Sequence, residues 1–384
     1  MSGRKRMVRW LAVGVATLVQ LALLTGCGGF FPPLTTTTGT TSSVGNFAYV
    51  ANSTTSTISA FVVGTNALTA VSGAPYSFPV SPTAMAVTPS DSYLYVAGNG
   101  GIYGYSINTS TGALTAVSSG GVLAITTLAP VSLDVSPDGN WLFALNGDGQ
   151  TFNEYQITAS TGALSLLAST PYTALNKATV VPQMIRVAPN GAYVFVALGT
   201  GGDLVFTLTT STGALSTTYQ QLATGSTSTS DNALAIDSGT TYAYIARSGT
   251  GGGLMVYSIG TNGALTPVTG SPFATGNGPF SVLLDSTGKY VYVANRTDAN
   301  ISGFSIGTGA VLTALSGSPY ASGSLVTSLA RDKSGSYVLA AASGGSPDLT
   351  MYSFDTTTLG KLDSVATTTT GTDPTGASVV VTTK

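Results

Sequence analysis

The feature that most constrains this sequence is a short aromatic and aliphatic segment that recurs seven times along the chain. The copies are FAYVAN from Phe47, YLYVAGN from Tyr93, WLFALN from Trp141, YVFVALG from Tyr193, YAYIAR from Tyr242, YVYVAN from Tyr290 and YVLAAAS from Tyr337. Equivalent residues in successive copies lie 46 to 52 residues apart. Because a period of this length is typical of folds assembled from repeated supersecondary units, we expect the body of the chain to be a repeat array.

Each repeat contains three further apolar segments separated by turn residues. Examples are ISGFSIG from Ile301, TGALTAV from Thr111 and the proline-led APVSLDVSPDG from Ala129. Short apolar runs bounded by Gly, Pro, Asn and Asp are typical of strands, and the glycines supply the positive φ of tight hairpins. Four-stranded sheets repeated at this period are typical of propeller blades. The sequence therefore predicts an all-β, seven-bladed β-propeller of four-stranded blades over residues 46–384.

The two ends of this body predict how the ring closes. The first repeat begins with its FAYVAN segment and has no proline-led segment before it, whereas DPTGASVVVTT from Asp373 supplies such a segment at the far end. Counted in this way, every repeat has its full set of strands. We therefore expect the C-terminal strand to complete the first blade beside the N-terminal strand.

The first residues predict export. Four basic residues lie within residues 1–9, and an uncharged apolar stretch follows from Trp10 to Leu24, which is the layout of a signal peptide and shorter than a membrane-spanning helix. The stretch ends in Leu24-Thr25-Gly26-Cys27, which resembles the lipobox of bacterial lipoproteins. That resemblance implies a signal peptide at 1–26 and lipid on Cys27; an ordinary signal peptide that contains a cysteine is the alternative.

Residues 27–45 are rich in Thr, Ser, Gly and Pro and lack apolar periodicity, so they are interpreted as a tether between the lipid and the folded body. Gly28 follows the cysteine where many lipoproteins retained in the inner membrane carry Asp. By that resemblance the protein is placed at the outer membrane, on its periplasmic or surface face, if the host has one. The predicted partners are the membrane, through the lipid, and an unknown ligand or protein of the cell envelope.

Charge and composition exclude several functions. Removal of residues 1–26 leaves nine basic against 15 acidic residues, too few cations for nucleic-acid binding. The chain contains no histidine, and its one cysteine is Cys27, so Ser-His-Asp and Cys-His nucleophiles are excluded, as are zinc, copper and haem sites of the usual kind. We predict no cofactor and no metal; Asp138 and Asp148, each before a glycine, are interpreted as turn residues.

The remaining charges near the strands are the candidate site residues. Asp134 and Arg186 hold equivalent positions in adjacent repeats, VSLDV and QMIRV, so they are predicted to form a structural pair between blades; a ligand-facing Arg186 is the alternative. Several polar residues fall where strands pass into loops and are candidates for a binding site at the channel mouth, with solvated loop ends as the alternative. These candidates are Gln183, Arg186, Arg247, Arg296, Arg331 and Lys333.

The pattern of proline, apolar strand, polar-Gly turn, Tyr-Val-Ala-Asn and Gly-Ala-Leu resembles two related families. They are the propeller lactonases similar to bacterial 6-phosphogluconolactonase and the YVTN-type repeat propellers of microbial surface proteins. The resemblance implies a propeller whose lactonase members place His, Arg and acidic residues at the channel mouth, in Pro-His and Arg-His segments. Here Pro182-Gln183 stands at the first segment and Asn232-Ala233 near the second, and neither carries histidine.

The predicted function is therefore a binding or scaffold module of the cell envelope. The alternative is a lactone hydrolase similar to 6-phosphogluconolactonase, with Arg186 and a nearby carboxylate acting on a water in place of histidine. A third possibility is a binder of cell-wall material or polysaccharide, which the threonine-rich composition allows.

Overall fold

A computed structural model describes residues 45–118, 121–125, 129–175, 180–224, 228–345, 347–370, 374, 376 and 379–384. The predicted signal peptide, Cys27 and all but the last residue of the predicted tether lie outside the described residues. Within the described part of the chain, no helix is long and apolar enough to cross a membrane.

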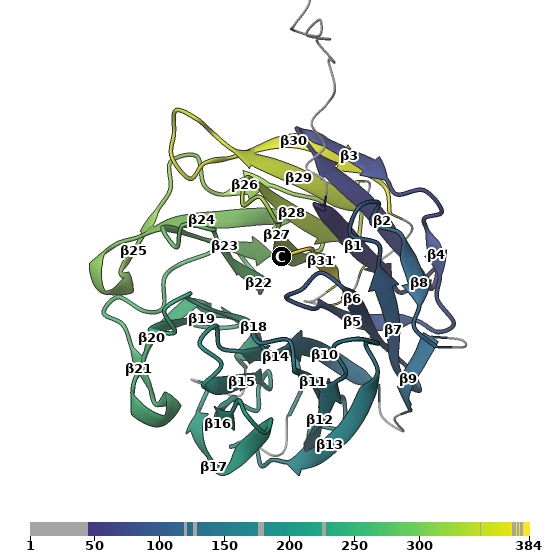
Figure 1. Ribbon diagram of the computed structural model, residues 1–384. Helices are drawn as coiled ribbons and strands as arrows, with labels where there is room; N and C mark the ends of the chain where they lie inside the picture. Colours follow the sequence, from purple (N-terminus) through teal and green to yellow (C-terminus); the bar gives the residue numbers. More distant parts are fainter. Residues whose placement is uncertain are drawn as a thin grey trace, which may run out of the picture. The chain divides into compact units, whose positions relative to one another are not determined.

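The described chain forms seven antiparallel β-sheets arranged as blades around a common centre (Figure 1). Blade 1 contains β1 (Phe47–Asn52), β2 (Thr57–Gly64), β3 (Ala67–Ala70), β4 (Tyr76–Ser77) and β31 (Val380–Thr382). Blade 2 contains β5 (Pro82–Val87), β6 (Tyr93–Gly98), β7 (Gly101–Ile107), β8 (Leu114–Ala116) and β9 (Val122–Ile125). Blade 3 contains β10 (Pro130–Val135), β11 (Trp141–Asn146), β12 (Thr151–Ile157) and β13 (Leu164–Pro171).

The other four blades repeat this arrangement. Blade 4 contains β14 (Met184–Val187), β15 (Tyr193–Ala197), β16 (Asp203–Thr209) and β17 (Ala214–Leu222), and blade 5 contains β18 (Ser230–Ile236), β19 (Tyr242–Ser248), β20 (Gly253–Ile259) and β21 (Leu265–Pro267). Blade 6 contains β22 (Pro279–Leu284), β23 (Tyr290–Asn295), β24 (Asn300–Ile306), β25 (Leu312–Ala314) and β26 (Tyr320–Ala321). Blade 7 contains β27 (Val326–Arg331), β28 (Tyr337–Ala342), β29 (Leu349–Phe354) and β30 (Leu362–Thr368). Short 3₁₀ turns, η3 (Thr261–Gly263) and η4 (Thr308–Ala310), precede β21 and β25.

The seven-bladed fold is thus confirmed, with four strands forming the main path of each blade. In blades 1, 2 and 6 a short additional strand pairs with the third strand. The third strand is the longer partner there: β2 has eight residues and β3 only four, so β4 pairs with the part of β2 that β3 leaves open. The sequence pattern showed the four main strands but not these short ones.

The second strands form the buried middle of the blades. Every residue of β1 and β11 is buried, because both faces of a blade pack against neighbouring blades. This is why the recurring segments are continuous apolar runs rather than alternating ones. The outermost strand β17, by contrast, is half-buried or exposed throughout and carries Ser, Thr and Gln.

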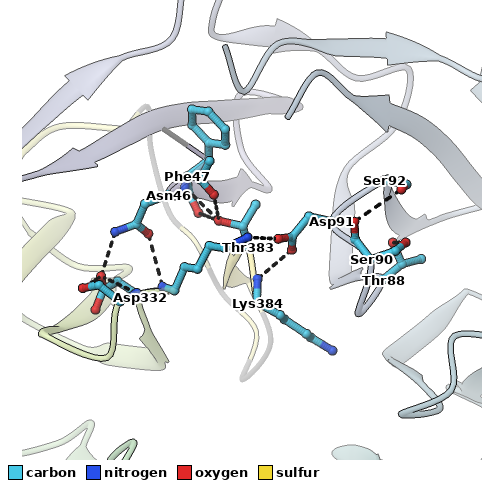
Figure 2. A network of polar contacts seen from close by, with 12 residues as sticks. Asn46, Phe47, Thr88, Ser90, Asp91, Ser92, Asp332, Thr383 and Lys384 are labelled. Atoms are coloured by element: carbon cyan, nitrogen blue, oxygen red, sulfur yellow. Dashed lines mark hydrogen bonds and ion pairs between the residues drawn. The ribbon is translucent and has the colours of Figure 1, made fainter. Parts of the chain in front are cut away.

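Ring closure follows the prediction. β31 pairs antiparallel with β1 through Ala48 and Thr382, Tyr49 and Val381, and Val50 and Val380. The pairing continues beyond the strand, where the Phe47 amide donates to Thr383 Oγ1 at 2.9 Å and the Thr383 amide donates to the Phe47 carbonyl at 3.0 Å (Figure 2). The two ends of the body therefore form one blade.

Adjacent blades meet at a repeated joint between an aromatic ring and a turn. The Tyr95 hydroxyl donates to the carbonyl of Gly162 in the next blade at 2.9 Å, and Tyr49 and Tyr292 make the equivalent bond to their next blades. Gly162 has φ +70°, and a Cβ added there would lie 2.5 Å from Cδ1 of Tyr93. The ring and glycine pairs in contact at these joints are Phe47 and Gly112, Tyr93 and Gly162, Trp141 and Gly213, Tyr193 and Gly263, and Tyr290 and Gly360. The recurring Tyr and Gly-Ala-Leu motifs are thus two halves of one contact.

A second set of contacts joins the innermost strands. Backbone amides of one inner strand donate to serine hydroxyls of the preceding blade, as Ile185 does to Ser132 Oγ at 3.2 Å and Leu329 does to Ser281 Oγ at 3.1 Å. An inner strand would otherwise present unpaired amides to the channel, which is costly wherever water is excluded. Small hydroxyl residues therefore connect the blades around the channel.

Substitution of a joint glycine tests the steric part of this account. We expect Gly162→Ala to lower the free energy of unfolding by about 2–3 kcal/mol, because a left-handed residue with a Cβ is strained and the Tyr93 ring must move. Gly309→Ala is the control, since Gly309 has φ +68° in a turn of blade 6 with nothing within 4 Å of the added carbon. It should lose only about 1–2 kcal/mol. Urea denaturation followed by circular dichroism measures both; equal losses would contradict the role of Tyr93.

Candidate binding site in the central channel

The inner strands enclose a cavity of about 500 Å³ where their C-terminal ends converge. All seven blades contribute one equivalent residue to its wall, namely the inner-strand residue that pairs with the third residue of the second strand. These residues are Ala86, Asp134, Arg186, Ala235, Leu283, Ala330 and Val381. We call this set the channel ring. Five of its members are apolar, and the two charged members stand next to each other in blades 3 and 4.

The structure places Asp134 and Arg186 side by side, on neighbouring inner strands. Asp134 Oδ2 accepts the Val187 amide of blade 4 at 2.8 Å. Arg186 Nη1 donates to the carbonyls of Ile185 at 3.1 Å and Leu133 at 3.5 Å. These bonds link each side chain to backbone, and both side chains are half-buried on the cavity wall. The direct pairing of the two side chains stays a prediction, and so does the ligand-facing role of Arg186.

Blade 7 supplies three further charged residues of this mouth, Arg331, Asp332 and Lys333, and Lys384, which follows β31, is a fourth. Arg331 is exposed, and its Nη1 donates to the Leu284 carbonyl of blade 6 at 3.5 Å. Asp332 holds its own turn, because Oδ1 accepts the Tyr337 amide at 2.7 Å and Oδ2 accepts the Ser334 amide at 3.1 Å. The Asp332 carboxylate is thus bound by backbone amides of its own turn, and Arg331 lines the cavity.

A cluster of polar contacts at the ring seam joins blades 7, 1 and 2 (Figure 2). Asn46 Nδ2 donates to Asp332 at 2.7 Å, and the Lys333 amide donates to Asn46 Oδ1 at 3.2 Å. Asp91 binds the Lys333 ammonium and accepts the Lys384 amide at 2.6 Å. Lys333 therefore lines the cavity as an ion-paired residue.

The other three predicted candidates, all within the described chain, lie at the opposite ends of the inner and second strands and do not line this cavity. Gln183 precedes β14, and its amide donates to the Ala197 carbonyl at 3.0 Å. Arg296 follows β23 and lies over the Phe280 ring, 5.0 Å from its centroid. The Arg247 side chain forms a buried ion pair with Asp231. The structure thus divides the six candidates between two mouths, three at each.

The buried ion pair belongs to a cluster that the sequence reasoning missed. Arg247 Nε and Nη2 donate to the two oxygens of Asp231 at 2.6 and 2.7 Å, with Arg247 4% exposed and Asp231 fully buried. Burial alone would lower the pKa of Arg247, but the hydrogen bonds and charge of Asp231 outweigh it and raise that pKa. A bidentate pair of this kind fixes both side chains.

Asp203 of blade 4 completes the cluster. Burial, followed by the charge of Asp231, raises the pKa of Asp203 well above its usual value, and the charge of Arg247 offsets only part of this. Asp203 is 2% exposed, and within the described residues neither of its carboxyl oxygens accepts a hydrogen bond. We therefore treat it as a neutral acid beside the bidentate pair of Asp231 and Arg247. The signal in the sequence was the rarity of charge: Asp203 is the first residue of β16 and Asp231 the second residue of β18, in a chain with only 15 acidic residues.

The predicted turn aspartates are confirmed as such. Asp138 Oδ1 accepts the Asn140 amide at 3.1 Å, and Asp148 Oδ1 accepts the amides of Gln150 and Thr151 at 3.0 Å. Within the described part of the chain, no group of three or more Asp, Glu, His or Cys side chains is placed to hold a metal.

Comparison with known proteins agrees with this architecture. The sequence model of the family described as "Lactonase, 7-bladed beta-propeller" matches residues 97–233, 199–316 and 268–381. None of the curated proteins matches the chain in sequence.

Several solved structures share the fold. A protein from Bacteroides fragilis, provisionally named a 6-phosphogluconolactonase, superposes with a TM-score of 0.72 at 17% identity, over 90% of this chain and 100% of its own. The periplasmic gluconolactonase of Pseudomonas aeruginosa gives 0.65 at 16% identity, over 88% and 99%. A protein of unknown function from Desulfotomaculum acetoxidans gives 0.65 at 15% identity, over 88% and 98%.

The protonation of Asp203 can be tested through stability. An acid whose pKa is raised on folding binds a proton in the folded state that the unfolded chain releases above about pH 4. Its contribution is therefore fully present below that pH and is lost as the pH rises through the folded pKa. Asp203→Asn keeps a neutral side chain at every pH, so its stability relative to wild type should grow by about 1.4 kcal/mol per pH unit over that window. Urea titrations at pH 5, 6, 7 and 8 measure this; parallel pH profiles would show that Asp203 is ionised.

Proposed function

Because the chain belongs to the seven-bladed β-propeller lactonase family, we propose that it is a cell-envelope member that binds a ligand in its channel without turning it over. The binding role is supported by the cavity of about 500 Å³ at the ends of the inner strands. This volume is within the range of small-molecule sites, which are mostly apolar and carry a few polar groups. The wall combines apolar inner-strand residues with six charged residues, Asp134, Arg186, Arg331, Asp332, Lys333 and Lys384.

One observation carries the non-catalytic part of the proposal. At the mouth where the resemblance implies reactive groups, Asp231 and Arg247 bind each other, and the two aspartates and the arginine are closed to water: Asp231 is 0%, Asp203 2% and Arg247 4% exposed. A general acid or base must come within hydrogen-bond reach of its substrate. A fully buried Asp231, with both oxygens bound to Arg247, does not reach one.

Composition supports the same conclusion. The whole chain has no histidine, and Gln183 occupies the position of the first expected histidine. Glutamine neither accepts nor releases a proton near neutral pH, so it cannot replace an imidazole in proton transfer. The chain therefore shares the architecture of the lactonases but lacks the histidines expected to transfer protons in them.

Export and lipid anchoring are part of the proposal. They are supported by the basic start, the short apolar stretch and the lipobox-like Leu24-Thr25-Gly26-Cys27. The Pseudomonas aeruginosa relative is named a periplasmic protein, which agrees with a location outside the cytoplasm. Two or three acyl chains would hold the protein on a membrane firmly.

A lactone hydrolase is the second candidate, favoured by one observation. Asp134 and Arg186 stand together on the wall of the open cavity, and Asp134 Oδ1 is not the oxygen that binds Val187. A carboxylate there can activate a water while a guanidinium stabilises the oxyanion that forms on the lactone carbonyl.

Hydrolysis assays decide between the two candidates. The full chain, extracted in detergent, is assayed with 6-phosphogluconolactone and a panel of neutral lactones, with Arg186→Ala as the matched variant. We expect no rate above the uncatalysed background from either protein. Turnover by the wild type that the variant loses would overturn the binding role and establish the hydrolase.

Anchoring is tested separately, at Cys27. In cells fed an alkyne-labelled palmitate, the wild-type chain should take up the label and sediment with the membranes. Cys27→Ser should take up none and appear in the soluble fraction, because serine cannot receive the diacylglyceryl thioether. Equal sedimentation of both proteins without label would show that the apolar stretch itself is the anchor.

A further inference from the structure

Three of the equivalent inner-strand positions that line the cavity carry a charged residue, and Asp332, Lys333 and Lys384 line it from positions just after these strands. The channel ring has one charged pair, Asp134 and Arg186, among its seven members. The next residue of each inner strand forms a second set of equivalents: Val87, Val135, Val187, Ile236, Leu284, Arg331 and Thr382. Arg331 is the one charged member of this second set.

Arg331 stands where equivalent positions hold packing residues. Val87 is 2%, Val135 3% and Val187 8% exposed, so this position normally contributes an aliphatic side chain to the blade interior. An arginine gives up that burial, and its exposed guanidinium reaches into the mouth instead. Residues that break a local rule without a stabilising return are expected at functional sites.

The two charged places face each other. The strand order puts blade 7 across the ring from the boundary of blades 3 and 4, with two blades between them on either side. Arg331 therefore lies on one side of the cavity, and Asp134 with Arg186 lies on the other. The wall between them is built mainly from apolar residues such as Ala86, Ala235 and Leu283, and Lys384 adds a further cation to the lining.

The hydrogen bonds of these charged groups indicate the charge of the ligand. The carboxylates are engaged by protein: Asp134 Oδ2 binds an amide, and Asp332 binds the amides of its own turn. In the described part of the chain, the Arg331 guanidinium donates to the neutral Leu284 carbonyl at 3.5 Å, the long limit of a hydrogen bond. Guanidinium groups bind carboxylate and phosphate through paired N–H donors.

We propose that this cavity binds a small organic anion: a carboxylate or phosphate group at Arg331, an apolar body against the wall, and a hydrogen-bonding group at Asp134 and Arg186. This inference rests on the proposed binding function and names the chemistry of its ligand. The site lies at the mouth opposite to the buried Asp231–Arg247 pair.

A matched series of six-carbon probes tests the ligand class. Isothermal titration calorimetry of the detergent-extracted full chain, in a buffer free of phosphate and carboxylate, is run with 6-hydroxyhexanoate, adipate, hexanoate, 1,6-hexanediol, 1,6-diaminohexane and inorganic phosphate. We expect the hydroxy acid and adipate to bind, hexanoate to bind more weakly, and the diol and diamine not to bind. Binding of inorganic phosphate alone would show an anion site without the apolar wall, and binding of the diamine would reverse the assigned sign; either result overturns the proposal.

Variants locate the binding. Arg331→Gln should weaken 6-hydroxyhexanoate binding by about tenfold or more, as expected for the loss of a charged hydrogen-bonding partner. Lys289→Gln removes the same charge from an exposed turn outside the cavity and should leave affinity unchanged. Arg331→Val restores the aliphatic residue of other blades, so it should fold at least as stably as wild type and not bind. Equal weakening by the Lys289 and Arg331 variants would mean that general surface charge, not this site, attracts the anion.

The outcomes for the two proposals are separable. Lactone turnover with anion binding at Arg331 intact would overturn the non-catalytic function and leave the site assignment standing. No lactone turnover together with no binding of any anionic probe would overturn the site assignment and leave the non-catalytic function standing.

Discussion

The whole fold depends on the contact between neighbouring blades. A single blade is a small sheet with apolar residues on both faces, so it cannot bury its core alone. Aromatic rings of the second strands pack against turns of the next blade, and serine hydroxyls bind the amides of the next inner strand. Because these contacts recur around a closed circle, the inner strands keep a fixed spacing. The cavity is a product of that spacing.

Much of this could be predicted from the sequence, because the joints are periodic. The Tyr of each recurring segment and the Gly of each Gly-Ala-Leu turn repeat at a nearly constant interval, and the unpaired segment after Asp373 indicated how the ring closes. Asp138 and Asp148 were also predictable, since an Asp-Gly pair between strands is local turn chemistry. The repeat interval and the turn residues can both be recognised directly in the amino-acid sequence.

The site was less predictable, because its chemistry depends on what two different blades bring together. Arg186 and Arg247 looked alike in the sequence, each near a strand end, yet Arg186 lines the open cavity and Arg247 is buried against Asp231. Asp203 and Asp231 belong to different blades, and no repeat interval relates their side chains. A residue lies at one mouth of the channel or the other according to the end of the inner strand that it occupies. Only the register of strand pairing shows which end that is.

The two mouths of the channel therefore differ in how they hold charge. At one, an arginine and two aspartates are withdrawn from water; the arginine pairs with one aspartate, and burial keeps the other neutral. At the other, charges stand on the wall of an open cavity among apolar neighbours. The same fold accommodates both arrangements because residues outside the contacts between blades can differ from one blade to the next.

The pairing of β1 with β31 also sets an order of events in biogenesis. β1 is the first strand of the body to be synthesised, and its inner edge has no partner until residues near 380 have been made. For the whole time between, that edge offers free amides and carbonyls to any other extended chain. A propeller of this design is thus most exposed to misassembly before its last few residues are made. Shortening it there would leave a nearly complete ring in which the inner edge of β1 has no partner strand.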